Sequence, residues 1–449
     1  MLFLIVIILV LFLSVNLILS KWDWFAPGVI FSGVFLLSAI MCLLMADTYQ
    51  ITFHYQTLVV LLMGCGVFTV TEAFVGSTRI AGRKRQPAMV RHEAQMIEIP
   101  RFITVVMLLV VAVYGFMAIQ YIRRAAASIG ASGALTTLIA TFNRASKFSD
   151  SANFSQYRPL LFVVLDSPCR CYAYITLYAF IYNLVNFKKL DRLQLIYLLS
   201  FVAAVFLQGD RSPVFRLVTA GIMYTVFFIC AKRRKRFSTK KLYKLAIILF
   251  AVFYLLMISR YLVGRYSENS TVLSPTFAYF GGPLLNLDTF LQGTVRRSEI
   301  WGQQTFRNLI NMFGGFFHIS QWSYKLDLPF MRHNGIVTGN VYTTFYMFLY
   351  DFGYLGVIPL TAVIAIYYCI AYKRVSNFNR MDYGSMPLGV LIYGFLFNDL
   401  IMLMFSNRFY ETVGKIGFVE NIVYFILFQK IITLGFHDRK PYLRLRLNR

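Results

Sequence analysis

The sequence predicts an all-α membrane protein: a polytopic bundle of about eleven transmembrane helices with a large extracytoplasmic loop. Hydrophobic residues make up 58% of the 449 residues and charged residues only 14%, whereas a soluble domain carries roughly a quarter charged residues. The mean hydropathy is +0.62. Apolar runs of about 20 residues, each long enough to cross a hydrocarbon core of roughly 30 Å, recur along the chain. The short alternating segments of a β-barrel are not visible.

These runs indicate one polytopic domain over 1–449 rather than several soluble ones. The first run, MLFLIVIILVLFLSVNLILSK, has the hydrophobicity of a signal peptide. It lacks a basic n-region and is long, so a retained first helix is expected. The predicted spans are 2–20, 25–46, 51–75, 101–121, 159–187, 193–208, 213–231, 243–263, 341–371, 386–405 and 415–436.

The net charge of +25 raises the question of nucleic-acid binding. Its distribution argues against it, because the basic residues cluster in short stretches between spans, which is typical of cytoplasmic loops near anionic lipid headgroups. This pattern places the N-terminus outside and the C-terminus in the cytoplasm. The basic stretches are Arg79–Arg101, Lys188–Arg192, Lys232–Lys244, Lys373–Arg380 and Arg439–Arg449.

The same topology places two long segments outside, 122–158 and 264–340, and the second is the longest stretch without a span. Both carry several arginines, against the positive-inside trend, although long loops translocate regardless of charge. A bound anion would explain these cations; ordinary surface solubility is the alternative. Aromatic residues such as Trp301 and Trp322 suit either stacking on sugar rings or a membrane-interface belt.

The sequence lacks the motifs that are typical of several functional classes. There is no GxxxxGK[ST] phosphate loop, no GxGxxG turn and no cysteine spacing typical of a metal site. The six cysteines lie mostly in apolar spans, where small apolar packing is the favoured interpretation. We therefore predict no nucleotide-binding domain, no metal and no cofactor, so that a substrate of any chemistry would arrive already activated.

Ionisable residues at the ends of spans are candidates for function, because burying them in hydrocarbon is costly. The stretch QGDRSP, 208–213, interrupts two apolar runs and places Asp210 and Arg211 at the outer face. An arginine held by a tight turn offers a bidentate donor for phosphate. The alternative is a local ion pair of these two residues that ends a helix. Arg216 and Arg260 would either reach a shared cavity or snorkel to the interface.

The ninth predicted span starts with a polar face. Asn340, Thr344, Met347 and Asp351 follow the i, i+4, i+7, i+11 spacing of one helix side, so the polar members would point into the bundle. Asn340 would contact substrate, and the carboxylate would accept a proton from a sugar hydroxyl or cap a neighbouring turn.

Within the segment 264–340, AYFGGPLLNLDTFL (278–291) predicts a Gly-Gly-Pro turn beside a short amphipathic helix that lies at the membrane interface. His318 and His333 are the histidines of this segment. A lone histidine is more often structural than catalytic, but a site facing a phosphate leaving group favours a base.

Three segments together resemble the Wzy-type oligosaccharide repeat-unit polymerases of bacteria, which make O-antigen and capsule. They are the GDRSP turn, YFGGPLLNLD, and NVYTTFYMFLYDFGYLG before a late span. The order of segments and the predicted topology match along most of the chain, including the large outer loop in the second half.

The resemblance implies a GT-C-like fold and a metal-independent glycosyltransferase of the bacterial inner membrane. Its substrate would be an oligosaccharide linked to undecaprenyl pyrophosphate, and its partners a chain-length regulator and a flippase. Arginine donors would stabilise the departing pyrophosphate, and a carboxylate or histidine would take the acceptor proton. Arg211 is the first candidate for the pyrophosphate, and the choice of base stays open. Further arginine candidates are Arg260, Arg265, Arg296 and Arg297; the candidate bases or sugar contacts are Asp288, His318, His333 and Asp351.

Three alternatives remain. A lipid-linked oligosaccharide flippase would also line a cavity with arginine, but would show two related halves and short loops. An O-antigen ligase shares the architecture and differs in its acceptor. A non-enzymatic scaffold would leave the outer arginines and the polar face of the ninth span unexplained.

Overall fold

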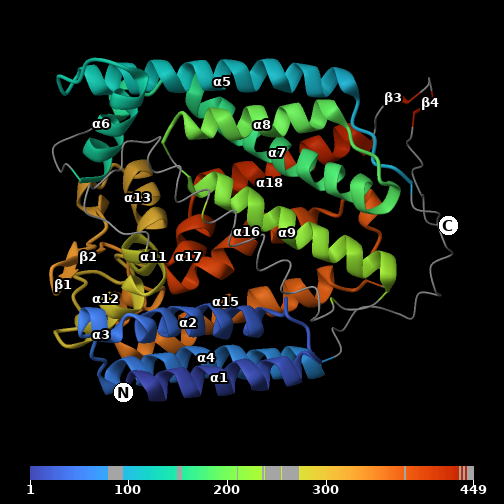
Figure 1. Cartoon of the computed structure of the whole chain (residues 1–449). Helices are drawn as coiled ribbons and strands as arrows, with labels where there is room; N and C mark the ends of the chain where they lie inside the picture. Colours follow the sequence, from blue (N-terminus) through green and yellow to red (C-terminus); the bar gives the residue numbers. More distant parts are fainter. Residues whose placement is uncertain are drawn as a thin grey trace. The chain divides into compact units, whose positions relative to one another are not determined.

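A computed structural model describes residues 1–78, 95–148, 154–209, 211–234, 237, 254, 273–378, 381–433, 436–437 and 440–441. Helices account for nearly all of its regular structure (Figure 1). In the described part of the chain, strands form only two short antiparallel hairpins: β1 (Met331–His333) with β2 (Ile336–Gly339), and β3 (Phe436–His437) with β4 (Lys440–Pro441). The prediction of an all-α membrane protein is confirmed at this level.

Seven helices within the described ranges are long and apolar enough to cross a membrane. Each falls on a predicted span. Two further predicted spans, 193–208 and 386–405, coincide with shorter apolar helices, α8 (Arg192–Phe206) and α16 with η4 (Leu388–Met404). The predicted span 415–436 is occupied by α18 (Ile416–Thr433), while 243–263 lies outside the described residues apart from position 254. The seven are α1 (Leu2–Leu19), α2 (Pro27–Leu44), α4 (Tyr55–Ser77), α5 (Arg101–Ala127), α7 (Leu160–Phe187), α9 (Ser212–Arg233) and α15 (Tyr354–Val375).

The chain divides into two compact units that are interleaved along the sequence. Unit 1 comprises Met1–Pro87, Asn269–Asn377 and Leu396–Phe418, and unit 2 comprises Ala88–Glu268, Phe378–Phe395 and Val419–Arg449. Each unit is therefore built from segments far apart in the chain.

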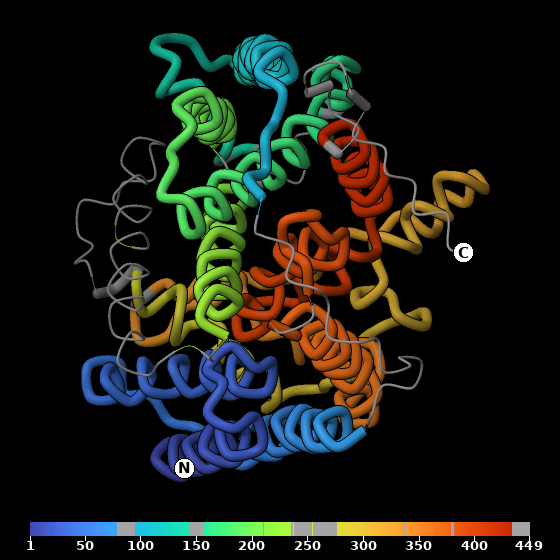
Figure 2. The backbone as a smooth tube through the Cα atoms, turned by 90° about the vertical axis from the view of Figure 1, so that its right-hand side faces the viewer, coloured from blue at the N-terminus to red at the C-terminus, as the bar shows by residue number. Residues whose placement is uncertain are grey.

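In unit 1, α1, α2, α4 and α15 pack side by side (Figure 2). Aromatic rings join α2 to its neighbours: Phe31 stacks on Phe68 of α4 with centroids 4.0 Å apart, and Phe35 stacks at 5.3 Å on Phe345, which begins α14 (Phe345–Phe352). At the C-terminal end of α4, the Lys373 ammonium group donates to the carbonyls of Val75 and Thr78. A cation at this position satisfies carbonyls that the helix leaves unpaired and complements its dipole.

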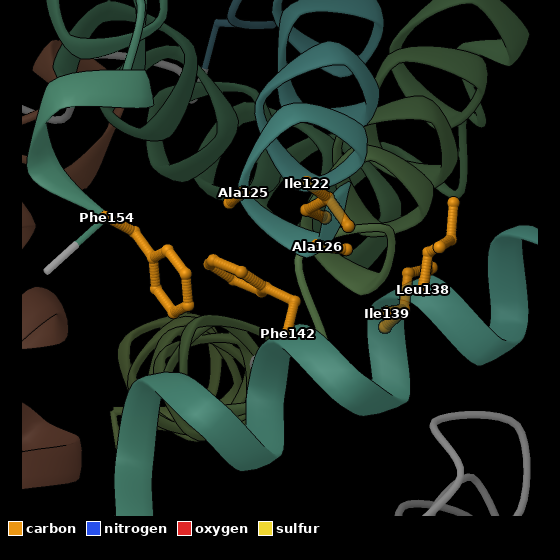
Figure 3. Close-up of a cluster of buried hydrophobic side chains, with 7 residues drawn as sticks. All are labelled: Ile122, Ala125, Ala126, Leu138, Ile139, Phe142 and Phe154. Atoms are coloured by element: carbon orange, nitrogen blue, oxygen red, sulfur yellow. The ribbon is translucent and has the colours of Figure 1, made fainter. Parts of the chain in front are cut away.

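In unit 2, α5, α7, α8 and α9 form the helical core. The predicted outer segment 122–158 contains more helix than a plain loop: α5 continues to Ala127, and α6 (Leu135–Phe148) follows. Figure 3 shows how α6 is attached, with Phe142 facing Phe154 and the aliphatic side chains of α6 facing α5. The buried cluster consists of Ile122, Ala125, Ala126, Leu138, Ile139, Phe142 and Phe154.

The predicted helix over 341–371 is wrong in its first part. Residues 341–343 are not helical, α14 spans only Phe345–Phe352, and α15 begins after Gly353. Gly353 has φ +62° and ψ −159°, a conformation that ends α14 and that side chains other than glycine rarely adopt. Asn340 therefore does not share a helix face with Asp351, and the expected polar face begins only at Thr344, at the start of α14.

The segment 278–291 also differs from its prediction. It forms two helices, α11 (Leu273–Phe280) and α12 (Gly282–Leu291), that meet at the expected Gly-Gly turn. The whole stretch 281–288 is buried instead of lying at an interface. Ser38 and Cys42 of α2 donate to the carbonyls of Phe280 and Gly281, so the turn is tied to the helix bundle of unit 1.

Gly64 of α4 provides a test of this packing. A Cβ atom at position 64 would lie 2.2 Å from Cζ of the Phe345 ring, which is fully buried among other rings and has little room to move. We expect Gly64→Ala to destabilise the protein by about 1–3 kcal/mol through overpacking, measured as a lower Tm in detergent micelles.

Gly66→Ala is the matched control, because it lies on the same helix and nothing stands within 4 Å of its Cβ position. It should leave the Tm unchanged or slightly higher, since alanine favours a helix over glycine. Equal Tm values for the two variants would contradict the described contact between α4 and α14.

Candidate functional site

The segment 273–340 gathers at one end of the long helices of unit 1. Figure 1 shows α11, α12 and the β1–β2 hairpin close to α3 (Ala46–Tyr49), which lies between the end of α2 and the start of α4. Asn334 at the hairpin tip donates to the Tyr49 carbonyl at 2.6 Å. The polar and aromatic segment 273–340 therefore lies at the N-terminal end of α4. The basic side chain of Lys373 lies at the opposite, C-terminal end.

Asp288 of α12 caps the start of α4. Its carboxylate accepts from the backbone N–H of His54 at 2.9 Å and from the Thr57 hydroxyl at 2.5 Å. Asp288 is 2% exposed, and an acidic group is favoured at a helix N-terminus, where the amide groups lack partners within the helix. A predicted site residue is therefore part of the structural framework, and it also orients a neighbour.

That neighbour is His54, which the sequence analysis did not select. Its Nδ1 lies 2.8 Å from Oδ2 of Asp288. The His54 side chain is 48% exposed and that of Asp288 only 3%. A carboxylate bound to Nδ1 keeps the proton on that nitrogen, so Nε2 of the neutral ring carries the lone pair. The pair has the composition of an oriented general base, with an acidic residue holding a partly exposed imidazole.

His333 of β1 belongs to the same neighbourhood. Burial lowers the pKa of His333, and the negative charge of Asp288 acts in the opposite direction. Its Nε2 is buried, and among the described residues no group is placed to form a hydrogen bond with it. The structure thus brings two of the predicted residues, Asp288 and His333, into one neighbourhood with His54.

Other predicted residues lie elsewhere in unit 1. His318 is exposed, with a left-handed backbone at φ +56° that follows the end of α13 (Arg307–Phe316). Asn340 is half-buried just after β2. Its segment is held by a buried neighbour: Asn286 of α12 donates to the carbonyls of Gly339 and Val341 and fixes this stretch in a non-helical form.

The carboxylate of Asp351 binds backbone amides of its own unit. The residue is 1% exposed, and its carboxylate accepts from the N–H of Gln304 at 3.0 Å and of Thr305 at 2.6 Å. These bonds hold the chain that leads into α13. A base must present a lone pair to its substrate, so the contacts of Asp351 favour the structural alternative.

Arg296 and Arg297 are exposed on the chain that follows α12. The Arg297 guanidinium lies over the Phe290 ring at 4.8 Å, and its Nε donates to the Thr294 carbonyl at 2.8 Å. Cation–π contact and a backbone bond fix the position of this guanidinium at the protein surface. Arg296 and Arg297 therefore remain candidates for an anionic substrate.

Arg211 lies in unit 2, where it precedes α9 and is half-buried. Gly209 has φ +68° and Pro213 occupies the first turn of α9, whereas Asp210 lies outside the described residues. Arg216, one turn further, lies over the Phe395 ring at 4.9 Å. Arg260 and Arg265 lie outside the described residues.

Unit 2 also contains a polar chain that sequence reasoning missed. Gln208, beside the GDRSP turn, donates to the Tyr114 hydroxyl at 2.8 Å, which in turn donates to Asp166 at 2.7 Å. Arg170, one turn along α7, pairs with the same carboxylate. The i, i+4 spacing of Asp166 and Arg170 was the available signal. The chain links the GDRSP turn to an ion pair within α7.

No group of three or more His, Cys, Asp or Glu side chains in the described ranges is arranged to hold a metal ion. The chemistry that the described groups support is proton transfer at His54 and anion binding by arginine.

The burial of His333 has a measurable consequence. Because burial favours the neutral ring, the unfolded chain takes up a proton more readily than the folded protein does, and stability falls as the pH drops below about 6.5. We expect His333→Gln to reduce the loss of Tm between pH 7 and pH 5. The difference should be modest, since the ring is half-buried. His318→Gln, at an exposed histidine, should keep the wild-type slope; a common slope for all three proteins would refute the prediction.

Comparisons with known proteins identify no relative of this chain. Neither protein-family models, nor curated proteins, nor solved structures match the chain. The case for a function therefore rests on the sequence pattern and on the residues assembled around His54 and Asp288.

Proposed function

We propose that this protein polymerises oligosaccharide repeat units linked to undecaprenyl pyrophosphate, at the outer face of the bacterial cytoplasmic membrane. The observation that carries the proposal is the exposed His54 ring held at Nδ1 by the buried carboxylate of Asp288. It supplies the oriented base that the reaction needs, at the end of unit 1 where the polar segment 273–340 collects.

In the proposed reaction, a sugar hydroxyl of the acceptor attacks the anomeric carbon of the donor sugar. The glycosidic bond forms as the glycosyl–phosphate bond breaks, the hydroxyl proton moves to Nε2 of His54, and the electron pair of the broken bond leaves with undecaprenyl pyrophosphate. Asp288 acts as a positioning residue, since it stabilises the imidazolium that results.

Negative charge grows on the departing pyrophosphate, and arginine is suited to stabilise it through paired donors. Arg296 and Arg297, which belong to the same unit as His54, are assigned to this charge. Arg211 of unit 2 stays a candidate from the sequence alone. The products and substrates are both lipid-linked, so the bilayer holds donor and acceptor in one plane and reduces the entropic cost of bringing them together. No cofactor enters the scheme.

The arrangement around α4 supports the proposed orientation. Lys373 caps one end and Asp288 the other, and basic residues concentrate on the cytoplasmic side of membrane proteins. The end with His54 would then face outward, with the N-terminus outside and the C-terminus inside. A chain-length regulator and a flippase would act beside the enzyme.

The first experiment uses a deletion strain complemented with plasmid-borne variants. Deletion should leave a single repeat unit on the mature glycolipid, and the wild-type gene should restore the ladder on a gel. A normal ladder in the deletion strain would refute polymerisation, whereas loss of all glycan from the final acceptor, with long lipid-linked chains retained, would identify a ligase. Accumulation of cytoplasmic-face lipid-linked units would identify a flippase.

In the same strain, His54→Ala should slow polymerisation by about 10²–10⁴-fold, as expected for removal of a general base, at unchanged protein level in the membrane. Asp288→Asn should also slow it and shift the pH profile, and Asp288→Glu should restore part of the rate. His318→Ala is the control, at an exposed histidine of the same segment, and should retain the full ladder. Full activity in His54→Ala would remove His54 from the chemistry.

Arg211 has its own test. Arg211→Ala should abolish polymer while the protein remains folded and inserted, and Arg211→Lys should fail as well, because lysine lacks the paired donors of a guanidinium. Polymer length measured against membrane protein level would separate loss of function from loss of protein. Wild-type ladders from both variants would exclude Arg211 from pyrophosphate binding.

A further inference from the structure

Helix α13 in unit 1 packs with its polar side toward the protein. Asn308 donates to the Glu411 carbonyl of α17 (Arg408–Val413) at 2.7 Å. Asn311 exchanges two hydrogen bonds with the backbone of Tyr324, at 3.0 and 2.9 Å. One turn later Gly314 is buried against Trp322. Asn308, Asn311 and Gly314 therefore lie on the inward side of the helix.

The outward side is apolar. Leu309, Phe313 and Phe316 follow the i, i+4, i+7 spacing of one helix face, and they are 37%, 46% and 75% exposed. Phe317, directly after the helix, is 59% exposed, and its ring contacts Phe316 with centroids 5.0 Å apart. A helix of a water-soluble surface shows the reverse, with its apolar stripe toward the core.

This apolar face continues to the start of a candidate span. Phe306, which precedes α13, stacks on Trp301 at 5.3 Å, and Trp301 contacts Phe352 edge-on at 5.2 Å. Phe352 ends α14, and two residues into α15 Leu355 is 86% exposed. Trp301 itself is 74% exposed, and tryptophan is enriched where a membrane meets water. These ring contacts link the residues before α13 to the start of α15, a candidate span whose exposed side chains lipid is expected to cover.

We propose that α13 is an in-plane membrane helix, whose Leu309, Phe313 and Phe316 side chains enter the boundary between headgroups and acyl chains of the bilayer. Its polar side needs no water, because the amide groups of Asn308 and Asn311 are bonded to the protein. Burial of its apolar side in the bilayer is favourable, at the depth of roughly 5–10 Å that such helices reach. The inference does not depend on the enzymatic proposal, since it follows from burial and bonding of this helix alone.

The test places a fluorescent bimane label at Phe316→Cys and, as control, at Arg332→Cys on the exposed face of β1. All six native cysteines are buried, so the introduced thiol is the accessible one; unsubstituted protein measures any background. Phe316 is so exposed that its replacement removes few internal contacts. The labelled proteins are reconstituted in phosphatidylcholine nanodiscs, with or without doxyl-labelled phosphatidylcholine, and titrated with iodide.

The label at position 316 should be quenched by doxyl lipid and should respond to iodide several-fold more weakly than the label at position 332. Strong iodide quenching at 316 without doxyl quenching would show a water-exposed helix and overturn the proposal. Protection from both quenchers would also overturn it, because a second copy or another protein would then cover the face. Circular dichroism and size-exclusion profiles matching the wild type establish that the variants are folded.

Discussion

The carboxylate of Asp288 is the contact on which the functional end of unit 1 depends. One buried group satisfies a backbone amide, a hydroxyl and an imidazole at the start of α4. Leaving the buried Thr57 hydroxyl unpaired would cost about 1–3 kcal/mol. The bonds that hold α12 against α4 also set the orientation of His54, so packing and the orientation of this ring cannot be varied independently.

Helix α4 runs between the two ends of unit 1, and at each of its termini a side chain from another segment binds its polar groups. At its start the Asp288 carboxylate accepts from the amide of His54 and the hydroxyl of Thr57, and at its end the ammonium group of Lys373 donates to the last carbonyls. Between them, Gly64 admits the Phe345 ring, which locks α14 against the middle of the helix. The backbone break at Gly353 then lets α15 run beside α4 as a separate span.

Most spans were predictable because hydropathy is a local property: about 20 apolar residues form a helix in a membrane whatever their neighbours are. The start of the ninth span was not, since tertiary bonds override helix periodicity there. Asn286 binds the carbonyls of 339 and 341, and the N–H of Thr344 donates to the Leu403 carbonyl.

The residues of the candidate site were likewise predictable only in part. Asp288 and His333 were accessible to sequence reasoning because they lie within the long segment 264–340. His54 was not, because a histidine before an apolar run gives no signal until its carboxylate partner is known. That partner is 234 residues away in sequence. For Asp351 the spacing of polar residues left a base and a structural cap open, and the structure favours the cap, since its two oxygens accept from backbone amides.

The interleaving of the two units has a consequence for biogenesis. Ribosomes add about 5–20 residues per second, so the 234 residues between His54 and Asp288 separate their synthesis by roughly 10–50 s. The first helices of unit 1 enter the membrane long before the carboxylate that caps α4 exists, and the chain of unit 2 is largely made in the interval. Assembly around His54 is thus a late event, completed only when the returning chain docks on helices already inserted.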